Sequence, residues 1–145
     1  TKAESISPAE NGIDAVCTIG LTDQLHPGEK MTIHASSAVL ATGGFVGGGI
    51  KARRTEVWIE LLEEKLGGIT TEVLDRNALS RSGQDFMRMG AEVTDDLSVK
   101  DEIYNGRLFA CGDILAGHNF ASERSGAGIA AASAYLAGKN AAANI

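Results

Sequence analysis

Three short segments place glycine or another small residue where a buried strand ends or a helix begins. Thr42-Gly43-Gly44 follows the apolar run 37–41, Gly112-Asp113 follows the apolar run 108–111, and Ser125-Gly126-Ala127-Gly128 opens a predicted helix. Ligands of open α/β sheets bind outside the carboxyl ends of the strands, where small residues let the main chain come close. A helix N-terminus adds free N–H groups suited to anionic oxygens. Together the segments predict a ligand seat; the alternative is that each glycine only makes a tight turn.

The start of the predicted helix also matches a known glycine fingerprint, but only in its letters. Residues 126–131, Gly-Ala-Gly-Ile-Ala-Ala, fit G-x-G-x-x-G/A. That fingerprint follows a strand directly and opens a βαβ unit with an acidic residue about 20 positions further on. Here the preceding strand ends near Cys111, and residues 132–145 are too few for the rest of such a unit. The helix can therefore present N–H groups to a ligand, but it cannot be the first turn of an ADP-binding unit.

Two side chains that could take part in chemistry flank the entrance to this helix. Arg124 could clamp a phosphate or carboxylate, and His118 could relay a proton near neutral pH. We name both as candidate catalytic residues, with a solvated loop as the alternative. No metal site is predicted, because Cys17 and Cys111 lie far apart and follow no ligand spacing.

Length and composition favour one globular domain and exclude several classes of function. The chain has 145 residues, of which 43% are hydrophobic and 22% are charged. Its net charge of −6, with scattered acidic residues, argues against a nucleic-acid surface. The uncharged stretch 31–50 holds His34 and five glycines, so we expect no membrane insertion and a cytoplasmic protein.

The elements that must position these residues follow from short apolar runs bounded by turn formers. Residues 5–12 are rich in turn formers and end in Asn-Gly, a hairpin signal. We expect loop-like structure at 75–106, with turns at 95–96 and 104–106. The remaining predictions are strands at 13–20, 31–35, 37–41, 69–74 and 108–111, a turn at 26–28, and helices at 55–66 and 125–140.

Several of these segments resemble motifs of the flavoproteins that have two dinucleotide-binding domains. Ser37-Ala-Val-Leu-Ala-Thr-Gly-Gly44 resembles their middle flavin motif, and the segment 106–117 resembles their late motif with its Gly-Asp pair. The segment 125–133 resembles the final helix that faces the flavin pyrimidine. Within this fumarate-reductase-like superfamily, the order and spacing of segments over residues 31–142 resemble the C-terminal part of the B subunit of anaerobic glycerol-3-phosphate dehydrogenases.

The resemblance implies the fold class and the organisation of the chain. The class is α/β, a partial FAD-binding Rossmann-like fold with a mainly parallel sheet and a β-rich segment, lacking the N-terminal βαβ unit that binds ADP. A single domain over 1–145 would comprise strands leading to the Thr-Gly-Gly motif (1–50), a helix and variable segment (51–106), and the late motif with the final helix (107–145).

The resemblance also implies roles for individual residues around FAD, with FMN as the alternative cofactor. Thr42 and Gly43 would lie against the ADP or pyrophosphate side, Gly112 would approach the pyrophosphate, and Asp113 would accept a hydrogen bond from a ribityl hydroxyl. Main-chain N–H groups around Gly128 and Ile129 would stabilise negative charge at flavin N1 and O2 upon reduction. The predicted cofactor-binding residues are Thr42, Gly43, Gly44, Gly112, Asp113, Ser125, Gly126, Ala127, Gly128 and Ile129.

The implied activity is that of a flavin-dependent dehydrogenase of anaerobic respiration, which oxidises glycerol 3-phosphate to dihydroxyacetone phosphate. The implied partners are the catalytic A subunit of such a dehydrogenase and its membrane-attached iron–sulfur subunit, through which the chain could sit peripherally at the inner membrane. Without the ADP-binding unit, the isolated chain is expected to bind flavin weakly or not at all and to be inactive. The alternatives are a fumarate-reductase-like flavoenzyme with another substrate and a non-catalytic assembly domain.

Overall fold

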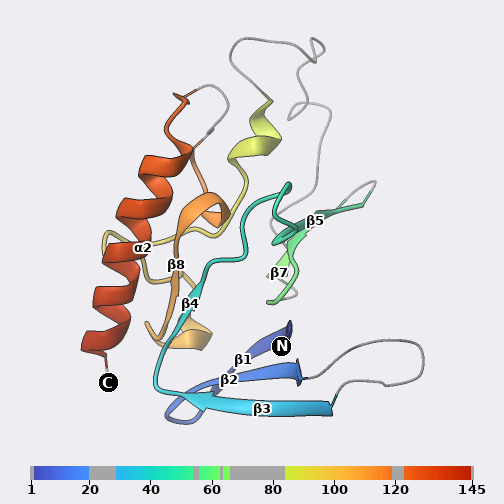
Figure 1. Ribbon diagram of the computed structural model, residues 1–145, viewed down its shortest axis with the longest axis vertical. Helices are drawn as coiled ribbons and strands as arrows, with labels where there is room; N and C mark the ends of the chain where they lie inside the picture. The colour runs from blue at the N-terminus through green and yellow to red at the C-terminus, as the bar shows by residue number, and fades with distance from the viewer. Residues whose placement is uncertain are drawn as a thin grey trace.

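The described residues form a mixed α/β structure in which three small sheets and a long helix pack around an apolar core (Figure 1). The computed structural model describes residues 2–19, 29–53, 56–62, 64–65, 84–118 and 123–144. The turn predicted at 26–28 and the strand predicted at 69–74 lie outside these ranges. The largest fully buried side chains are Phe109, Ile13, Leu40, Ile50, Ile59, Leu108, Ile114 and Val57.

The N-terminal sheet is an antiparallel meander of β1 (Lys2–Ala9), β2 (Gly12–Ile19) and β3 (Glu29–Ala35). The predicted Asn-Gly hairpin is confirmed, because β1 and β2 are joined at residues 10–11. Strand β1 itself was not predicted, because its sequence is rich in turn-forming residues. It tolerates Pro8 because it pairs only with β2, and an edge strand accepts proline.

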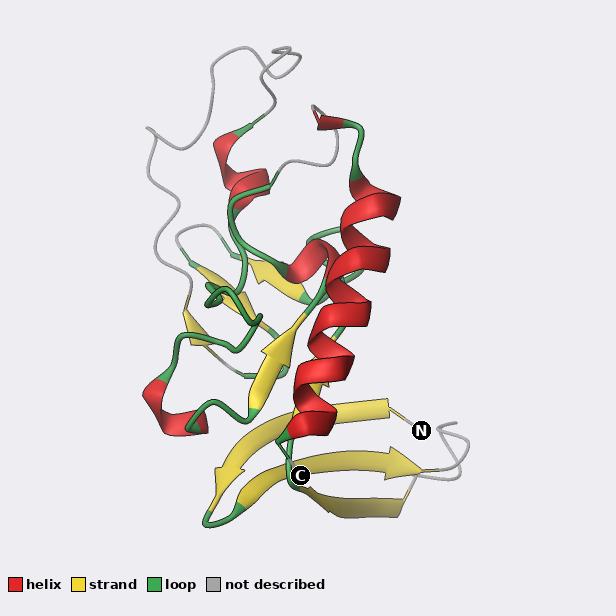
Figure 2. Ribbon diagram, turned by 90° about the vertical axis from the view of Figure 1, so that its left-hand side faces the viewer, coloured by secondary structure: helices red, strands yellow, loops and turns green. Residues whose placement is uncertain are grey.

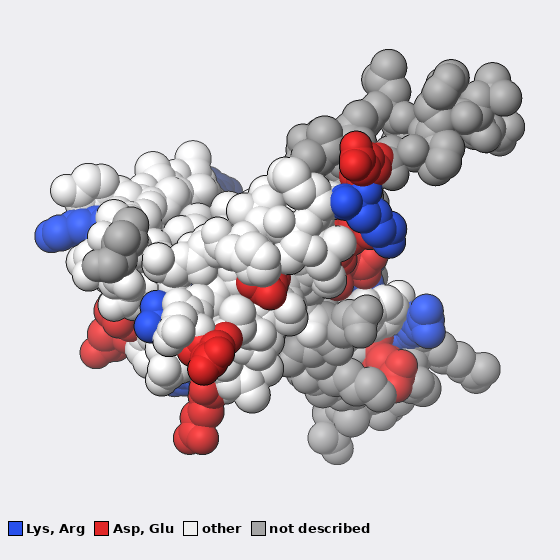
Figure 3. Space-filling model, turned by 90° about the horizontal axis from the view of Figure 1, so that it is seen from below, with Lys and Arg blue, Asp and Glu red and all other residues white. Residues whose placement is uncertain are grey.

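This sheet is anchored to the core at one side only. Ile13 of β2 is buried and Ile6 of β1 packs against the core, whereas all seven residues of β3 are exposed. Met31 and Ile33 of β3 keep 44% and 42% of their surface in solvent. On the face seen from below in Figure 3, the described acidic and basic side chains are scattered and form no continuous basic patch.

The centre of the molecule is a parallel pair formed by β4 (Ala38–Leu40) and β8 (Leu108–Ala110). Both strands were predicted, and all three residues of β8 are buried, as expected for a parallel strand. The prediction of a mainly parallel sheet is wrong for the described residues. There, parallel pairing is confined to β4–β8 and one bridge between Ala91 and Leu115, because the remaining strands are joined by short connections that favour antiparallel pairing.

Helix α2 (Gly126–Ala143) packs along this parallel pair (Figure 2). Its buried stripe, Ser133, Ala137 and Ala141, recurs every fourth residue and contacts the core beside Phe109 and Cys111. The helix was predicted over 125–140, and it extends slightly further, to Ala143, with Gly138 inside it. The rest of its surface is open, and Tyr135 is 75% exposed. No helix in the described ranges is long and apolar enough to cross a bilayer.

The helix predicted at 55–66 is wrong. The structure has β6 (Val57–Ile59) antiparallel to β5 (Ile50–Ala52), followed by β7 (Glu64–Lys65). Val57 and Ile59 are fully buried on either side of the half-exposed Trp58, so burial alternates with the period of a strand. β-Branched and aromatic residues favour this pleated arrangement.

The described part of the segment predicted to be loop-like, residues 84–106, consists of short turns and irregular stretches, as its polar composition predicted. Three 3₁₀ turns, η1 (Asp85–Arg88), η2 (Glu102–Tyr104) and η3 (Gly112–Ile114), lie among irregular stretches. The turns expected at 95–96 and 104–106 are confirmed. Asn105 adopts φ +49°, a left-handed conformation that asparagine tolerates better than most residues.

Candidate cofactor site

The first two glycine-bearing segments meet at the carboxyl ends of β4 and β8. Because these strands are parallel neighbours, the residues that follow them emerge at the same edge. The Gly44 N–H donates to Asp113 Oδ2 at 3.2 Å. A Cβ built on Gly44 would lie 2.5 Å from that oxygen and 2.8 Å from the Asp113 carbonyl oxygen. Glycine at position 44 therefore allows the two segments to touch.

The third segment reaches the same edge through the first turns of α2. The Gly112 N–H donates to Ser133 Oγ at 2.9 Å, and the Ser133 hydroxyl donates to the Ile129 carbonyl. A Cβ on Gly112 would lie 4.0 Å from Ala130 Cβ. The strand ends and the N-terminus of α2 lie at the same end of the molecule (Figure 1). The structure thus brings the first two segments into contact and places Ala130 and Ser133 of α2, which follow the third segment, beside Gly112.

Two glycines at this edge hold backbone conformations that other residues rarely adopt. Gly43 has φ +74° and Gly112 has φ +77°. A side chain at either position would strain the left-handed backbone. At Gly43 it would also meet Gly47 Cα at 3.1 Å. Both glycines are thus needed for the path of the chain, and they leave the main chain at this edge without side chains in front of it.

Two hydroxyls at predicted cofactor positions are buried without a hydrogen-bond partner. They are Thr42 Oγ1 and Ser125 Oγ, which are the buried unsatisfied side-chain atoms among the described residues. Ser125 precedes α2 but its side chain does not cap the helix. Leaving a buried polar group unpaired costs about 1–3 kcal/mol. Both atoms therefore fit a site in which a ligand rich in oxygen and nitrogen supplies the missing partners.

The N-terminus of α2 retains donors for such a ligand. Ile129 N–H is already donated to the Ser125 carbonyl at 2.9 Å. The preceding N–H groups, at Gly126, Ala127 and Gly128, belong to the first turn, which has no acceptor within the helix. A ligand at this end of the helix would therefore meet the N–H groups of Gly126, Ala127 and Gly128, whereas the predicted donor Ile129 N–H is already used within the helix.

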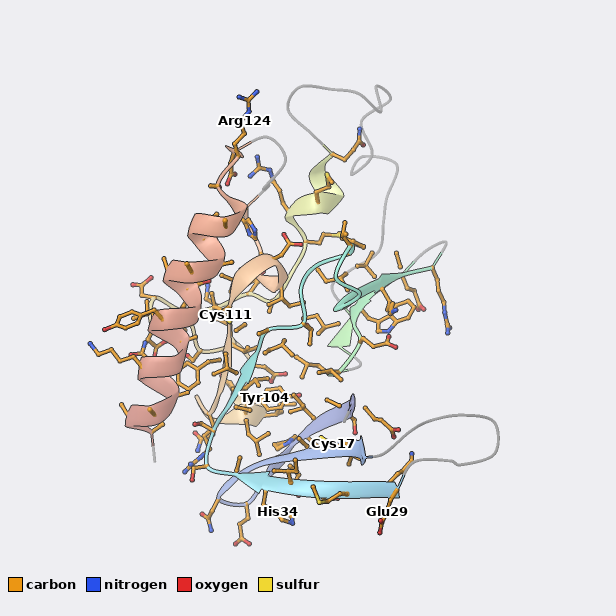
Figure 4. The ribbon with its side chains drawn as sticks, viewed as in Figure 1. Cys17, Glu29, His34, Tyr104, Cys111 and Arg124 are labelled. Atoms are coloured by element: carbon orange, nitrogen blue, oxygen red, sulfur yellow. The ribbon has the colours of Figure 1, made fainter. Side chains whose placement is uncertain are left out.

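The two predicted catalytic side chains lie in different surroundings. His118 Nε2 is 3.5 Å from Asp113 Oδ1, and His118 Nδ1 is 3.1 Å from the Leu115 carbonyl oxygen. The His118 side chain is only 13% exposed. Arg124 is exposed, has φ +54°, and points away from the strand ends at the start of α2 (Figure 4). The structure therefore brings His118 to Asp113 and leaves Arg124 toward solvent.

Arg88, a charged residue of η1, contacts the chain on both sides of the stretch that leads from η3 to α2. Its Nη1 donates to the Gly117 carbonyl at 3.0 Å and to Glu123 Oε1 at 3.3 Å. It thereby ties η1 to the segment between η3 and α2. A small cavity of about 30 Å³ lies beside it, lined by Gly44, Phe45, Val46, Ile50, Met87, Met89 and Asp113.

Neither cysteine contributes a reactive group to this edge. Cys17 lies in the N-terminal sheet and Cys111 at the end of β8, and both are buried and free (Figure 4). Burial raises the pKa of the Cys111 thiol, so the neutral form persists at neutral pH. The part of the chain that the structure describes holds no group of three or more His, Cys, Asp or Glu residues placed to bind a metal ion.

Comparison with known proteins gives one consistent relationship. No family model and no solved structure matches the chain. Two curated proteins do match, the probable B subunit of anaerobic glycerol-3-phosphate dehydrogenase from two strains of Halobacterium salinarum, R1 and NRC-1. Each is 30% identical over 136 residues, which cover 90% of this chain. The chain is a relative of this B subunit.

The match covers only part of these relatives. The aligned residues make up 32% of each B subunit, so the chain spans about a third of the length of the curated relatives it matches. The name of these relatives describes one subunit of a dehydrogenase.

Proposed function

We propose that this chain forms the flavin-facing part of a dehydrogenase related to these B subunits, with FAD, or alternatively FMN, at the edge formed by β4, β8 and α2. The observation that supports this best is the chain of contacts from Gly44 through Asp113 and Gly112 to Ser133. These contacts join residues 42–44, 112–113 and 126–133, which are far apart in sequence, into one glycine-rich edge that we call the rim. A Rossmann-like sheet, of which β4 and β8 would be two strands, belongs to the same proposal.

Within this proposal, residues of the rim hold and orient the cofactor. Thr42 and Ser125 supply hydroxyls that have no other partner, and Gly112 leaves room for a pyrophosphate. Asp113, whose side chain is 38% exposed, accepts a hydrogen bond from a ribityl hydroxyl. The N–H groups of Gly126 to Gly128 stabilise negative charge on the pyrimidine side. When bound, the flavin supplies the hydride acceptor.

The substrate we propose is a secondary alcohol, glycerol 3-phosphate, which would be oxidised to dihydroxyacetone phosphate with electrons passed to a respiratory chain. The printed name of the relatives supports this choice. Arg124 could take part in phosphate binding only if its exposed side chain turned toward the rim, because in this structure it points into solvent. The partners we propose are the catalytic A subunit and a membrane-attached iron–sulfur subunit, which would place the chain at the cytoplasmic side of the membrane.

A second candidate function is assembly without catalysis. It is favoured by the open surface of α2, in which Tyr135 is 75% and Leu136 is 37% exposed among alanines and glycines. Such a surface is suited to packing against another α/β layer. In that case the rim would be a folding feature, and no flavin would be bound.

The test is to purify the chain through an affinity tag from its native source, together with its bound partners, and to analyse this native assembly. We expect flavin absorbance at about 450 nm and reduction of a dye by glycerol 3-phosphate. Flavin without glycerol 3-phosphate activity would favour another substrate. Absence of flavin from an intact assembly would overturn the proposal and favour assembly alone.

A pair of variants links the signal to the rim. Thr42→Val removes a hydroxyl that has no partner in the protein, so the thermal stability of the protein should be unchanged or slightly higher while flavin occupancy falls several-fold. Thr32→Val, on the exposed strand β3, is the matched control and should leave occupancy unchanged. Equal occupancy in both variants would contradict a cofactor role for Thr42.

A further inference from the structure

We propose that His118 is a positioning residue, which holds the Asp113 carboxylate in the orientation needed for cofactor binding. The effect on cofactor binding rests on the proposed function. The effect of His118 on the Asp113 carboxylate concerns only residues of this chain and does not depend on a cofactor. His118 thereby acts through Asp113 and does not itself accept a proton from substrate.

The two oxygens of Asp113 face different partners. Oδ2 accepts the Gly44 N–H at 3.2 Å, and Oδ1 lies 3.5 Å from His118 Nε2. One carboxylate oxygen is thus hydrogen-bonded to the main chain after β4, and the other lies in contact with the imidazole, so a rotation of the carboxylate would disturb both neighbours. The 38% of the side chain that remains exposed is the part available to a ligand hydroxyl.

The surroundings of His118 support a fixed, doubly engaged ring. Its Nδ1 faces the Leu115 carbonyl oxygen at 3.1 Å, while its Nε2 faces the Asp113 carboxylate. Both neighbours are hydrogen-bond acceptors. Each imidazole nitrogen thus lies beside a protein oxygen, so the ring cannot turn without losing one of these two contacts.

The same contacts argue against a direct proton relay through His118. A general base needs an unoccupied lone pair within hydrogen-bond distance of the substrate proton. Both ring nitrogens already face protein oxygens, and only 13% of the side chain is exposed. Leu115 and Gly112 are linked by a main-chain hydrogen bond of 3.1 Å, so the carbonyl that faces Nδ1 belongs to the fixed turn η3.

The first experiment measures hydrogen exchange of the Gly44 amide in the 145-residue chain by NMR, with no cofactor present. His118→Leu should free the carboxylate and speed Gly44 exchange by about tenfold. His118→Gln keeps an N–H donor and should retain most of the protection. In an Asp113→Ala background, which removes the acceptor, His118→Leu should add nothing. The Cys111 amide, which donates to Leu40, is the control for general loosening.

The second experiment measures flavin occupancy of the native assembly for the same variants. We expect His118→Leu to lower occupancy, His118→Gln to restore it, and neither to matter once Asp113 is Ala. If His118→Leu speeds exchange of the Gly44 amide but neither the wild-type assembly nor any variant contains flavin, the positioning role stands and the proposed function fails. If the assembly contains flavin but His118→Leu leaves Gly44 exchange unchanged, the positioning role is overturned and the proposed function stands. The same holds if His118→Leu speeds exchange of the Cys111 amide as much as that of Gly44.

Discussion

The rim and the N-terminal sheet are stabilised in different ways. The rim joins residues 42–44, 112–113 and 126–133 through hydrogen bonds between segments distant in sequence, next to the fully buried strand β8. The sheet of β1 to β3 is joined by pairing between neighbours in sequence, and its outer strand is exposed throughout. The comparison teaches that the closest packing of the main chain lies where the three segments meet. In the N-terminal sheet, by contrast, apolar side chains are left exposed.

The largest difference is expected between two apolar truncations. Leu108→Ala, in the fully buried strand β8, should lower the free energy of unfolding by about 2–5 kcal/mol because it leaves a cavity. Ile33→Ala, on β3 with 42% exposure, should cost less than about 1 kcal/mol. Chemical denaturation of both variants checks this. Similar losses would mean that the two regions are equally well packed.

The next test concerns the close approach at Gly44. Gly44→Ala places a methyl group 2.5 Å from Asp113 Oδ2 and should destabilise the protein by about 1–3 kcal/mol. Gly138→Ala, on the open face of α2, meets nothing within 4 Å and should stabilise it by about 0.5–1 kcal/mol. Opposite signs in thermal unfolding would support the comparison. A neutral Gly44→Ala would contradict the close contact.

A smaller effect is expected at Ser133, which links η3 to α2. Ser133→Ala leaves the Gly112 N–H without its acceptor and should cost about 1–2 kcal/mol. Ala132→Ser, one residue earlier on the exposed side of the helix, is the control and should change stability little. The measurement is the midpoint of urea unfolding. A loss no greater than that of the control would show that the contact is dispensable.

The smallest effect is expected at the exposed turn that carries Asp96. The Thr94 hydroxyl, followed by the N–H and hydroxyl of Ser98, lowers the pKa of Asp96 below its ordinary value of 3.8. The stabilisation is thus present above this value and is lost as pH falls through the lower pKa of the folded state. Solvent screening makes it slight. Asp96→Asn should differ from wild type at pH 6 and converge with it in acid; a constant difference would contradict this.

Local patterns in the sequence were sufficient to predict the strands and the helix that form the rim. They were not sufficient to predict the structure of the segment 55–66. Strands β4 and β8 and helix α2 were predicted because each apolar run is bounded by glycine or serine at its functional end. The segment 55–66 was misjudged because Leu61 and Leu62 complete a helical spacing, whereas pairing of Val57 and Ile59 with β5 decides the outcome. Such pairing cannot be read from a single run.

Contacts between segments were also out of reach. The sequence singled out Asp113 and His118 separately, but only the turn η3 shows that the imidazole and the carboxylate face each other. Arg88 meets Gly117 across 29 residues, and no spacing rule connects them. The parts of the rim could therefore be predicted from residue types, while their mutual arrangement required the tertiary structure.

The position of Trp58, over which Arg53 stacks, determines which part of the protein tryptophan fluorescence would report. The guanidinium carbon of Arg53 lies 5.1 Å from the ring centre of the single tryptophan, on the sheet of β5 to β7. Intrinsic fluorescence therefore follows that sheet, whereas far-ultraviolet circular dichroism follows mainly α2. Superimposable melting curves from the two signals would show that the sheet and the helix unfold as one cooperative unit.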